Sequence, residues 1–341
     1  MATVNTTARV TMADVAQAAG VSVATVSKVV NNKDGISPAR TAHVRRIIDE
    51  MGYAASLGAQ SLRSRSTGVL GMLVAEFEPF STELLKGASR AIKATEYELL
   101  AYSGRSHSAP EDGWERRHLA RLSGALIDGA VIVTPSGTET IFPVPVVAID
   151  PHLDTDALPT VRCNSYDGAF QATSYLAELG HTKIGYLGGR SDLKSSQERE
   201  LGYRDALLNA GIAVNDAYIG QGDYLPEASQ APAREILSRE DRPTAIFAAN
   251  DLSAIEVIKV AEELGLNVPR DLSVIGFDNV PEAALFRIPL TTMAQPLGEM
   301  GEIALNMLAK IISGEEVETQ VLLPVELVVR DSCAPPQHRA Q

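Results

Sequence analysis

Apolar residues recur at helical spacing over residues 12–30, in two short runs separated by Gly20. The inward face of the first run is formed by Val15, Ala16 and Ala19, and that of the second by Val26, Val29 and Val30. Gly20 has the backbone freedom that a tight turn needs, and the Ser22 hydroxyl is placed to cap the second helix. Two short helices joined in this way are typical of a helix-turn-helix, whose second helix lies in the major groove of DNA. An ordinary helical hairpin with a structural role is the alternative.

A third helix is predicted from Pro38 to about Met51. Ser37 precedes the proline as an N-cap, and Gly52 ends the helix. Its inner stripe is formed by Val44, Ile47, Ile48 and Met51, whereas Arg40, Arg45 and Arg46 face outward. Three helices of this size enclose a very small core, which indicates a domain that a partner steadies.

From Thr67 onward the pattern changes to short apolar strands that alternate with amphipathic helices. Strands are predicted over 69–74, 98–101, 130–133, 144–149, 160–162, 184–187, 245–248 and 273–276, and helices over 82–94, 111–122, 167–179, 197–210 and 252–264. Such alternation gives parallel sheets covered by helices on both faces. The predicted fold class is therefore a small all-α helix-turn-helix head followed by an α/β body of two doubly wound parallel-sheet lobes. Ligands of such sheets bind beyond the carboxyl ends of the strands.

Charge is distributed unevenly along the 341 residues. The formal net charge is −13, yet residues 1–66 hold eight basic and four acidic side chains, so a small basic head precedes a strongly acidic body. Apolar residues make up 45% of the chain, which is enough for a large core. The sequence shows no export signal and no apolar run long enough to cross a bilayer. Two cysteines, Cys163 and Cys333, match no metal or redox spacing and are expected to be inert thiols. These features predict a cytoplasmic protein of two or three domains that is not a membrane protein.

The chain resembles the LacI-type transcriptional regulators along essentially its whole length. The most specific match covers 10–16 (VTMADVA), 20–22 (GVS), 25–31 (TVSKVVN), Ser37 and Gly52-Tyr53. The resemblance implies a DNA-binding head at 1–57, a hinge helix or linker at 58–66, and an effector-binding and dimerisation body at 67–341. It also implies a periplasmic-binding-protein-like body, with lobe 1 at 67–162 and 291–322 and lobe 2 at 163–290 and 323–341. The chain is then expected to cross between the lobes near Arg162, Leu290 and Leu322.

The resemblance assigns DNA contacts to the opening of the second helix. Val23 and Ala24 offer apolar contact to bases such as the thymine methyl, and Lys28 is placed to donate to guanine O6 or N7, without the bidentate fork of an arginine. Thr25, Ser27, Asn31 and Ser37 have short donors suited to phosphates, and Thr11 and Ser22 complete the predicted DNA-binding set of the head. A helix cap or a solvated face is the alternative for Thr25 and Ser27.

The hinge is expected to reach the minor groove. Leu62, preceded by Ala59, matches the family's leucine wedge, and an apolar wedge unstacks a base step and bends the duplex. The sequence departs from the family pattern at Tyr53-Ala54-Ala55-Ser56, and Gly58 lowers helix propensity, which predicts a looser hinge in the free protein. A plain linker role for Leu62 is the alternative.

Polar residues follow several predicted strands of the body. Asp150 and Asp278 each follow a strand directly, and Asn250-Asp251 follows another. Carboxylates accept hydrogen bonds from hydroxyls, and an amide both donates and accepts, so this set suits a polyhydroxylated ligand such as a sugar. Asn250 and Asp251 are also suited to cap the following helix, and for Asp251 we favour that role.

The family match adds further residues to the predicted effector set. Arg199, in the segment that begins at Ser195, takes the place of the family's effector-binding arginine, and Tyr224 that of a stacking aromatic residue. An aromatic face covers the C–H side of a sugar ring, and Phe80 is placed to close the other side. The complete predicted set is Phe80, Asp150, Ser195, Arg199, Tyr224, Asn250 and Asp278. A structural ion pair of Arg199 with Asp278, and a surface turn at Tyr224, are the alternatives.

Enzyme chemistry finds little support in the sequence. Gly185-Tyr186-Leu187-Gly188-Gly189 lacks the three-glycine dinucleotide spacing, and no phosphate-cradling loop, nucleophile elbow or histidine pair at metal-ligand spacing occurs. We therefore predict a regulator that is not an enzyme and carries no cofactor or metal. The expected partners are near-palindromic operator DNA, a mono- or oligosaccharide effector and a second copy of the chain, in repression of carbohydrate-utilisation genes. The alternatives are an effector that is a purine or nucleoside, and a cytoplasmic sugar-binding protein or enzyme without a DNA role.

Overall fold

A computed structural model describes residues 10–31, 33–53, 66–104, 114–124, 126–136, 141–152 and 158–337. These residues fall into two compact units, a head that ends at Thr67 and a body that begins at Gly68. The predicted hinge residues Ala59 and Leu62 lie outside the described residues. No helix in the described ranges is long and apolar enough to span a membrane.

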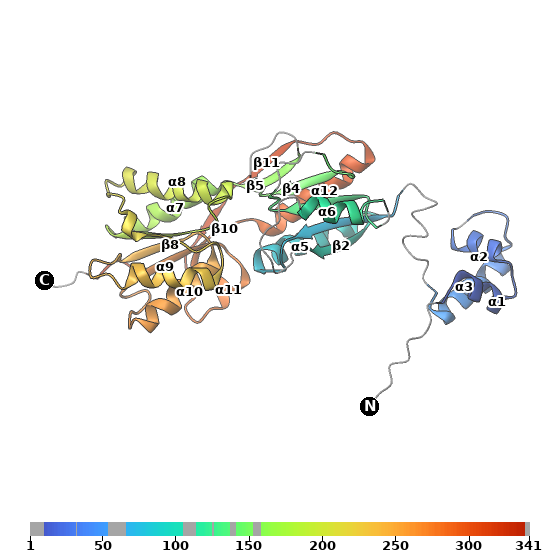
Figure 1. Cartoon of the computed structure of the whole chain (residues 1–341), viewed down its shortest axis with the longest axis horizontal. Coiled ribbons are helices and arrows are strands. Elements are labelled where there is room, and N and C mark those ends of the chain that lie inside the picture. The colour runs from blue at the N-terminus through green and yellow to red at the C-terminus, as the bar shows by residue number, and fades with distance from the viewer. Residues whose placement is uncertain are drawn as a thin grey trace, which may run out of the picture. The chain divides into compact units, whose positions relative to one another are not determined.

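The described part of the head contains three helices, α1 (Met12–Ala19), α2 (Val23–Val30) and α3 (Pro38–Met51), drawn in blue in Figure 1. Thr11 caps α1, because its hydroxyl accepts a hydrogen bond from the Asp14 backbone N–H and the Asp14 carboxylate accepts one from the Thr11 N–H. Gly20 adopts φ 66° between α1 and α2, a left-handed conformation that glycine takes without a Cβ penalty.

The other predicted ends of the head helices also occur in the structure. The Ser22 hydroxyl accepts from the Thr25 N–H at 3.1 Å at the start of α2, and Gly52 ends α3. Ser37 holds the N-cap position of α3, yet its side chain makes no capping hydrogen bond. The fully buried residues of the head form one small core: Val15, Ala16, Ala19, Val26, Val29 and Val44.

The body contains two six-stranded sheets, which confirms the predicted class of two parallel-sheet lobes (Figure 1). The first sheet has the order β11-β5-β4-β3-β1-β2 and is parallel throughout. Its strands are β1 (Val69–Val74), β2 (Glu98–Ser103), β3 (Gly129–Val133), β4 (Val146–Ile149), β5 (Thr160–Cys163) and β11 (Gln320–Leu323). β1, β3 and β4 are buried along their whole length because helices cover both faces of the sheet.

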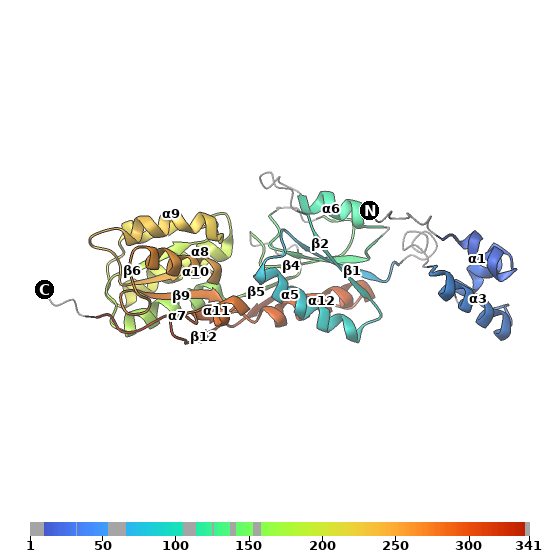
Figure 2. The same cartoon turned by 90° about the horizontal axis from the view of Figure 1, so that it is seen from below.

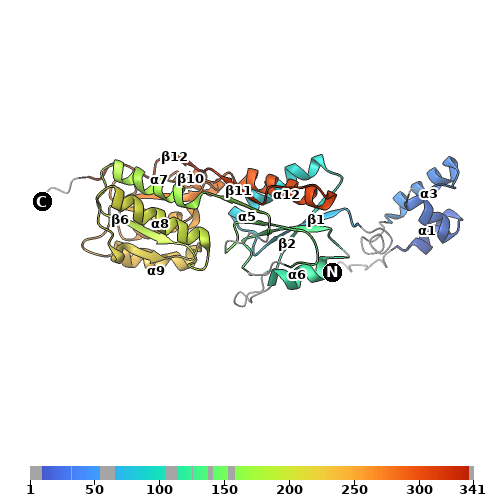
Figure 3. The same ribbon diagram turned by 90° about the horizontal axis from the view of Figure 1, so that it is seen from above.

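In the described ranges, three helices cover the first sheet. They are α5 (Pro79–Ala91), α6 (Trp114–Leu122) and α12 (Leu297–Ser313). Figures 2 and 3 show α5 and α12 together on one face and α6 on the other. A close approach joins α5 to α12, because a Cβ on Gly87 would lie 1.8 Å from the Gly298 carbonyl oxygen. Glycine at this crossing therefore allows the two helices to touch backbone to backbone.

The second sheet has the order β12-β10-β9-β8-β6-β7, and only its edge strand β12 is antiparallel to its neighbour. Its strands are β6 (Ile184–Gly188), β7 (Ile219–Gln221), β8 (Ala245–Ala248), β9 (Ser273–Asp278), β10 (Thr291–Ala294) and β12 (Glu326–Val328). The helices of this lobe are α7 (Ser165–Glu178), α8 (Lys194–Asn209), α9 (Pro226–Leu237), α10 (Asp251–Glu263) and the short α11 (Pro281–Leu285). α7 and α8 cover one face of the sheet, and α9 and α10 cover the other (Figure 1).

The chain passes between the lobes in three crossovers, which follow β5, β10 and β11. The expected position of the second was wrong. β10 pairs with β9 from Thr291 to Ala294, so it belongs to the second lobe, and the chain leaves that lobe after Ala294 rather than near Leu290. The reason is that Thr291–Ala294, with two threonines among four residues, lacks the apolar run by which strands were predicted, so only its pairing with β9 shows that it is a strand of the second sheet.

Candidate functional site

The start of α2 offers the head's predicted base-reading side chains to the surface. Val23 is 48% exposed, and Ala24 and Lys28 are also exposed, whereas Thr25 and Ser27 are half-buried. The hydroxyls of Thr11 and Ser22 take part in helix caps, and the Asn31 side-chain amide donates to the Ser27 carbonyl at 2.6 Å. Ser37 is exposed before α3. The structure thus leaves an apolar pair and one lysine on the outer surface of the helix that resembles a recognition helix.

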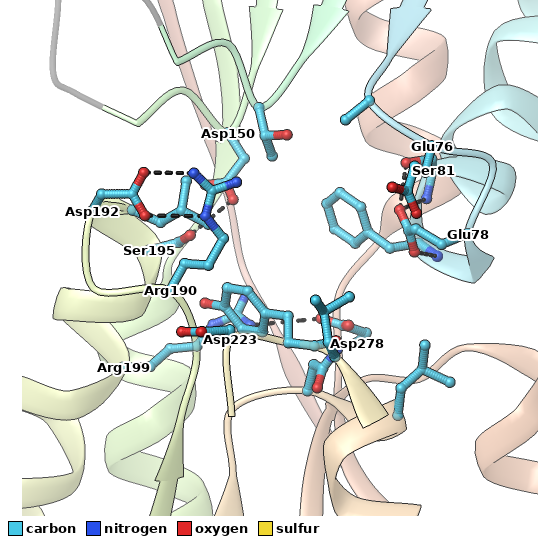
Figure 4. A pocket seen from close by; sticks show the side chains of 18 of the residues that line it. Glu76, Glu78, Ser81, Asp150, Arg190, Asp192, Ser195, Arg199, Asp223 and Asp278 are labelled. Atoms are coloured by element: carbon cyan, nitrogen blue, oxygen red, sulfur yellow. Dashed lines mark hydrogen bonds and ion pairs between the residues drawn. The ribbon is translucent and has the colours of Figure 1, made fainter. Parts of the chain in front are cut away.

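A cavity of about 430 Å³ lies in the body, within the size range of small-molecule sites. All seven predicted effector residues line it: Phe80, Asp150, Ser195, Arg199, Tyr224, Asn250 and Asp278. The lining comes from both lobes, and Figure 4 shows Glu76, Glu78 and Ser81 across the cavity from Arg190 and Asp192. Most of these seven residues lie at or just after the carboxyl end of a strand. The carboxyl ends of parallel strands lie along the same edge of a sheet, which brings these side chains together.

Arg199 is the most firmly held polar group of the cavity wall. It is 3% exposed, and its Nη1 donates to the Ala249 carbonyl at 2.6 Å and lies 3.7 Å from Asp278 Oδ1. Its guanidinium stacks on the Phe277 ring with 3.8 Å between the guanidinium carbon and the ring centroid, and the Tyr224 ring lies 5.7 Å away. The guanidinium therefore occupies a fixed place with one edge toward the cavity.

Two carboxyl groups stand beside this arginine. Asp278 is the last residue of β9, is 6% exposed, and accepts a 2.6 Å hydrogen bond from Gln295 Nε2. Asp150 follows β4 and accepts from the Ser195 hydroxyl at 2.9 Å. Burial raises the pKa of Asp278 to about 7 and raises the pKa of Asp150 as well, while the nearby Arg199 opposes both shifts. A ligand that satisfies these carboxyls would relieve part of the cost of burying them.

Backbone strain is concentrated at this cavity. Six described residues other than glycine have a positive φ, and five of them line the cavity: Thr134, Asp150, Asp223, Tyr224 and Asp278. The sixth, Asn279, follows Asp278 directly. Non-glycine residues in this region of φ cost free energy and collect at sites where geometry serves function. Such clustering is typical of a functional site, and it is an observation separate from the shape of the cavity.

The aromatic walls depend on close backbone approach. A Cβ on Gly189 would lie 2.0 Å from Tyr224 Cζ, so the Tyr224 ring packs directly on the Gly189 backbone. On the opposite side, Phe80 belongs to the first turn of α5, which Glu78 caps by accepting from the Phe80 and Ser81 N–H groups at 2.7 and 2.8 Å. Burial raises the pKa of the Glu78 carboxyl. Each aromatic ring is thereby fixed by a local backbone feature.

Of the two residues expected to cap α10, Asn250 is confirmed, and the favoured role of Asp251 as a cap was wrong. Asn250, not Asp251, is the N-cap, and its Oδ1 accepts from the Ser253 N–H while its Nδ2 donates to the Tyr224 carbonyl. Asp251 is fully buried and accepts from Thr292 Oγ1 at 2.5 Å and from the Val280 N–H at 2.9 Å. Asn250 therefore both caps a helix and lines the cavity, while Asp251 braces the turn after β9.

Sequence reasoning missed several residues of the lining. Arg190 and Asp192 form a bidentate ion pair, with Nε–Oδ1 3.1 Å and Nη2–Oδ2 2.6 Å (Figure 4). Thr134 and Asp223 follow β3 and β7, and Glu76 follows β1. The rule that found Asp150 and Asp278, polar residues just past a strand, also points to these.

Comparison with known proteins bears directly on this arrangement. Residues 11–56 match the model of bacterial regulatory proteins of the lacI family, and residues 173–333 match that of the periplasmic binding protein-like domain. The HTH-type transcriptional repressor PurR of Photobacterium profundum is 32% identical over 94% of this chain and 98% of its own length. The chain belongs to the lacI family of bacterial regulatory proteins. The resemblance read from its motifs is confirmed.

Two further relatives extend the comparison of this lacI-family protein. Catabolite control protein A of Priestia megaterium is 32% identical over 95% of this chain and 99% of its own length. A solved complex of the transcriptional regulator CelR with cellobiose is 30% identical, with a TM-score of 0.71, and covers 95% of this chain and 100% of that chain. The lacI-family chain is a DNA-binding transcriptional repressor with an effector-binding body.

Proposed function

We propose that this repressor controls carbohydrate-utilisation genes and that its effector is a neutral mono- or oligosaccharide bound in the cavity. The observation that carries the proposal is the charge of the described lining. It holds six carboxyl side chains, those of Glu76, Glu78, Asp150, Asp192, Asp223 and Asp278, and two guanidinium groups, those of Arg190 and Arg199. Each arginine faces one of these carboxylates, so acceptors exceed the available donors. Sugar hydroxyls donate to such acceptors, whereas a phosphate or carboxylate ligand would be repelled.

The aromatic side chains fit the same ligand. Tyr224 and Phe80 line the cavity from different lobes, so their rings are placed to cover the apolar faces of a sugar. Asp150, Asn250, Asp278, Arg199 and Ser195 would then bind its hydroxyls. The complex of the 30% identical CelR with cellobiose supports an oligosaccharide in particular.

A purine or nucleoside is the second candidate effector. Relatives that are 32–33% identical carry the name PurR, and an arginine, an aspartate and an aromatic ring also suit a base. The excess of carboxyl groups over arginines favours the sugar, because a purine base has few hydrogen-bond donors for these acceptors, whereas each sugar hydroxyl has one.

On the DNA side, we expect a cytoplasmic homodimer that places two heads on a near-palindromic operator. Lys28, Val23 and Ala24 would read bases, and Thr11, Ser22, Thr25, Ser27, Asn31 and Ser37 would approach phosphates. Ala59 and Leu62 are proposed to contact the minor groove. The effector changes operator affinity only as far as it binds the two lobe arrangements with different affinity.

A thermal-shift panel on the full chain tests the effector class. The panel contains neutral mono- and disaccharides, their phosphate esters, and purine bases and nucleosides. A ligand at 100 times its Kd stabilises the folded state by about 2.7 kcal/mol, a clear rise in Tm. We expect a neutral sugar to give this rise and its phosphate ester to give none.

Two variants serve as matched controls in the same panel. Tyr224→Leu should abolish the rise, whereas Lys28→Ala, in the head, should leave it unchanged. The active ligand is then added during selection of bound duplexes from random DNA, where it should change the amount of duplex retained. A rise with bases and none with sugars would replace the sugar by the second candidate.

A further inference from the structure

A buried amide joins the cavity to the crossovers between the lobes. Gln295 lies in the second crossover, between β10 and α12, and is 7% exposed. Its Nε2 donates to Asp278 Oδ1 at 2.6 Å, and its Oε1 accepts from Cys163 Sγ at 2.8 Å. Cys163 is the last residue of β5, where the first crossover begins. The Gln295 side chain therefore links a carboxyl group of the cavity to the residue at which the first crossover begins.

The chemistry of the partners sets the direction of this amide. Asp278 Oδ1 also faces Arg199 Nη1 at 3.7 Å, so it acts as an acceptor and takes the NH₂ side of Gln295. The remaining amide oxygen then needs a donor, which the Cys163 thiol supplies. Burial raises the pKa of that thiol to about 12, so it stays protonated and unreactive.

The contacts continue into a closed network. Cys163 Sγ lies 3.8 Å from Ser165 Oγ, and Arg199 Nε donates to the same hydroxyl at 3.4 Å, which leads back to Asp278. The third crossover joins through the Asn164 N–H, which donates to the Leu323 carbonyl at 3.0 Å. All three crossovers are thus linked to one carboxyl of the cavity.

The two lobes change their relative arrangement only if these crossover segments change their backbone angles. A buried polar network holds such segments firmly, because breaking one hydrogen bond leaves a buried polar group without a partner and without water to replace it. A ligand that bonds Asp278 competes for the oxygen that Gln295 uses. We propose that Cys163 and Gln295 act as positioning residues that couple occupancy of Asp278 to the crossover geometry, and so to operator affinity. This inference rests on the proposed function of the cavity.

Neither residue lines the cavity, so variants separate coupling from binding. Cys163→Ala removes the donor to Gln295 and leaves the bond between Gln295 and Asp278, whereas Cys163→Ser restores a donor. Gln295→Met removes both bonds at similar volume. The matched control is Cys333→Ala, because Cys333 donates to the backbone carbonyl of Val274 and lies outside the cavity lining.

The first measurement titrates the full-length variants with the sugar that stabilises the wild type. Cys163→Ala should change the effector Kd less than about two-fold and should reduce the effector-dependent change in operator affinity about five-fold, the factor of one net hydrogen bond. Cys163→Ser and Cys333→Ala should keep the wild-type change. An unaltered effector response in both Cys163→Ala and Gln295→Met would overturn the inference.

The second measurement needs no effector. Hydrogen exchange of the free proteins is followed at the backbone N–H groups of positions 164 and 295. The first donates to the Leu323 carbonyl at the end of β11, and the second donates to the Asp278 backbone carbonyl at the end of β9. We expect about five-fold faster exchange in Cys163→Ala and Gln295→Met than in the wild type and in Cys333→Ala. Unchanged exchange refutes the coupling role even if no sugar or base in the panel binds. If no compound in the panel binds but the two variants still exchange faster than the wild type, the result counts against the proposed function of the cavity and not against the coupling role.

Discussion

Removal of the Arg199 guanidinium tests how the cavity is held together. In Arg199→Met, Asp278 loses the cation 3.7 Å away, the Ala249 carbonyl loses a 2.6 Å hydrogen bond, and methionine keeps contact with the Phe277 ring. Breaking a buried ion pair by removing one partner costs about 3–5 kcal/mol of folding free energy, because the other charge stays buried. At about 2–4 °C per kcal/mol, the Tm should fall by about 6–20 °C.

The loss should depend on pH in a defined direction. The pKa of Asp278 is raised by burial to about 7, above its value in the unfolded chain, and loss of Arg199 raises it further. A carboxyl with a raised folded-state pKa binds more protons in the folded state, so its protonation stabilises the fold as pH falls. The difference in the free energy of unfolding between the wild type and Arg199→Met should therefore be largest near pH 8 and become smaller toward pH 5.

Urea unfolding followed by circular dichroism at pH 5 and pH 8 measures both effects. The double variant Arg199→Met/Asp278→Asn should recover part of the loss, since no charge is then left unpaired. The control is Arg204→Met on the same helix, which breaks half-exposed ion pairs with Glu200 and Asp216 and should cost less than about 1 kcal/mol. If Arg199→Met cost no more than this control, or if its deficit grew toward low pH, the account of the buried pair would be wrong.

Three further predictions follow from separate parts of the molecule. Gly189→Ala places a methyl group 2.0 Å from a Tyr224 ring atom, so we expect a stability loss of about 1–3 kcal/mol and at least ten-fold weaker effector binding by calorimetry; wild-type affinity would show that the ring is not held there. Lys28→Ala should weaken operator binding and lower the slope of log affinity against log salt by about 1 if the lysine contacts a phosphate, and leave the slope unchanged if it contacts a base. Arg330→Ala removes the 2.6 Å hydrogen bond that Arg330 Nη2 donates to Asn279 Oδ1. We expect a loss of about 1–3 kcal/mol in the free energy of urea unfolding and weaker effector binding, because Asn279 adjoins Asp278. An unchanged effector Kd would show that Arg330 contributes only to stability.

Local sequence patterns determined the elements of this protein. The spacing of Val15, Ala16 and Ala19, with Gly20 and Ser22, is enough to specify the helix-turn-helix, because helix period, turn and cap depend on neighbours within a few residues. The alternation of apolar strands with helices specified the two parallel sheets. The carboxyl ends of parallel strands lie along one edge of the sheet. Polar residues at these ends therefore predicted a common cavity wall before any strand pairing was known.

The tertiary structure alone decided the relations between distant residues. Neither the lobe to which β10 belongs nor the bond from Cys163 to Gln295, 132 positions apart, is visible in a local pattern. The same holds for the Gly189 backbone beneath the Tyr224 ring, where a glycine reads in sequence as a turn. The physical reason is that hydrophobic burial and hydrogen bonding reward any compatible partner, and the choice among partners is made by packing of the whole chain.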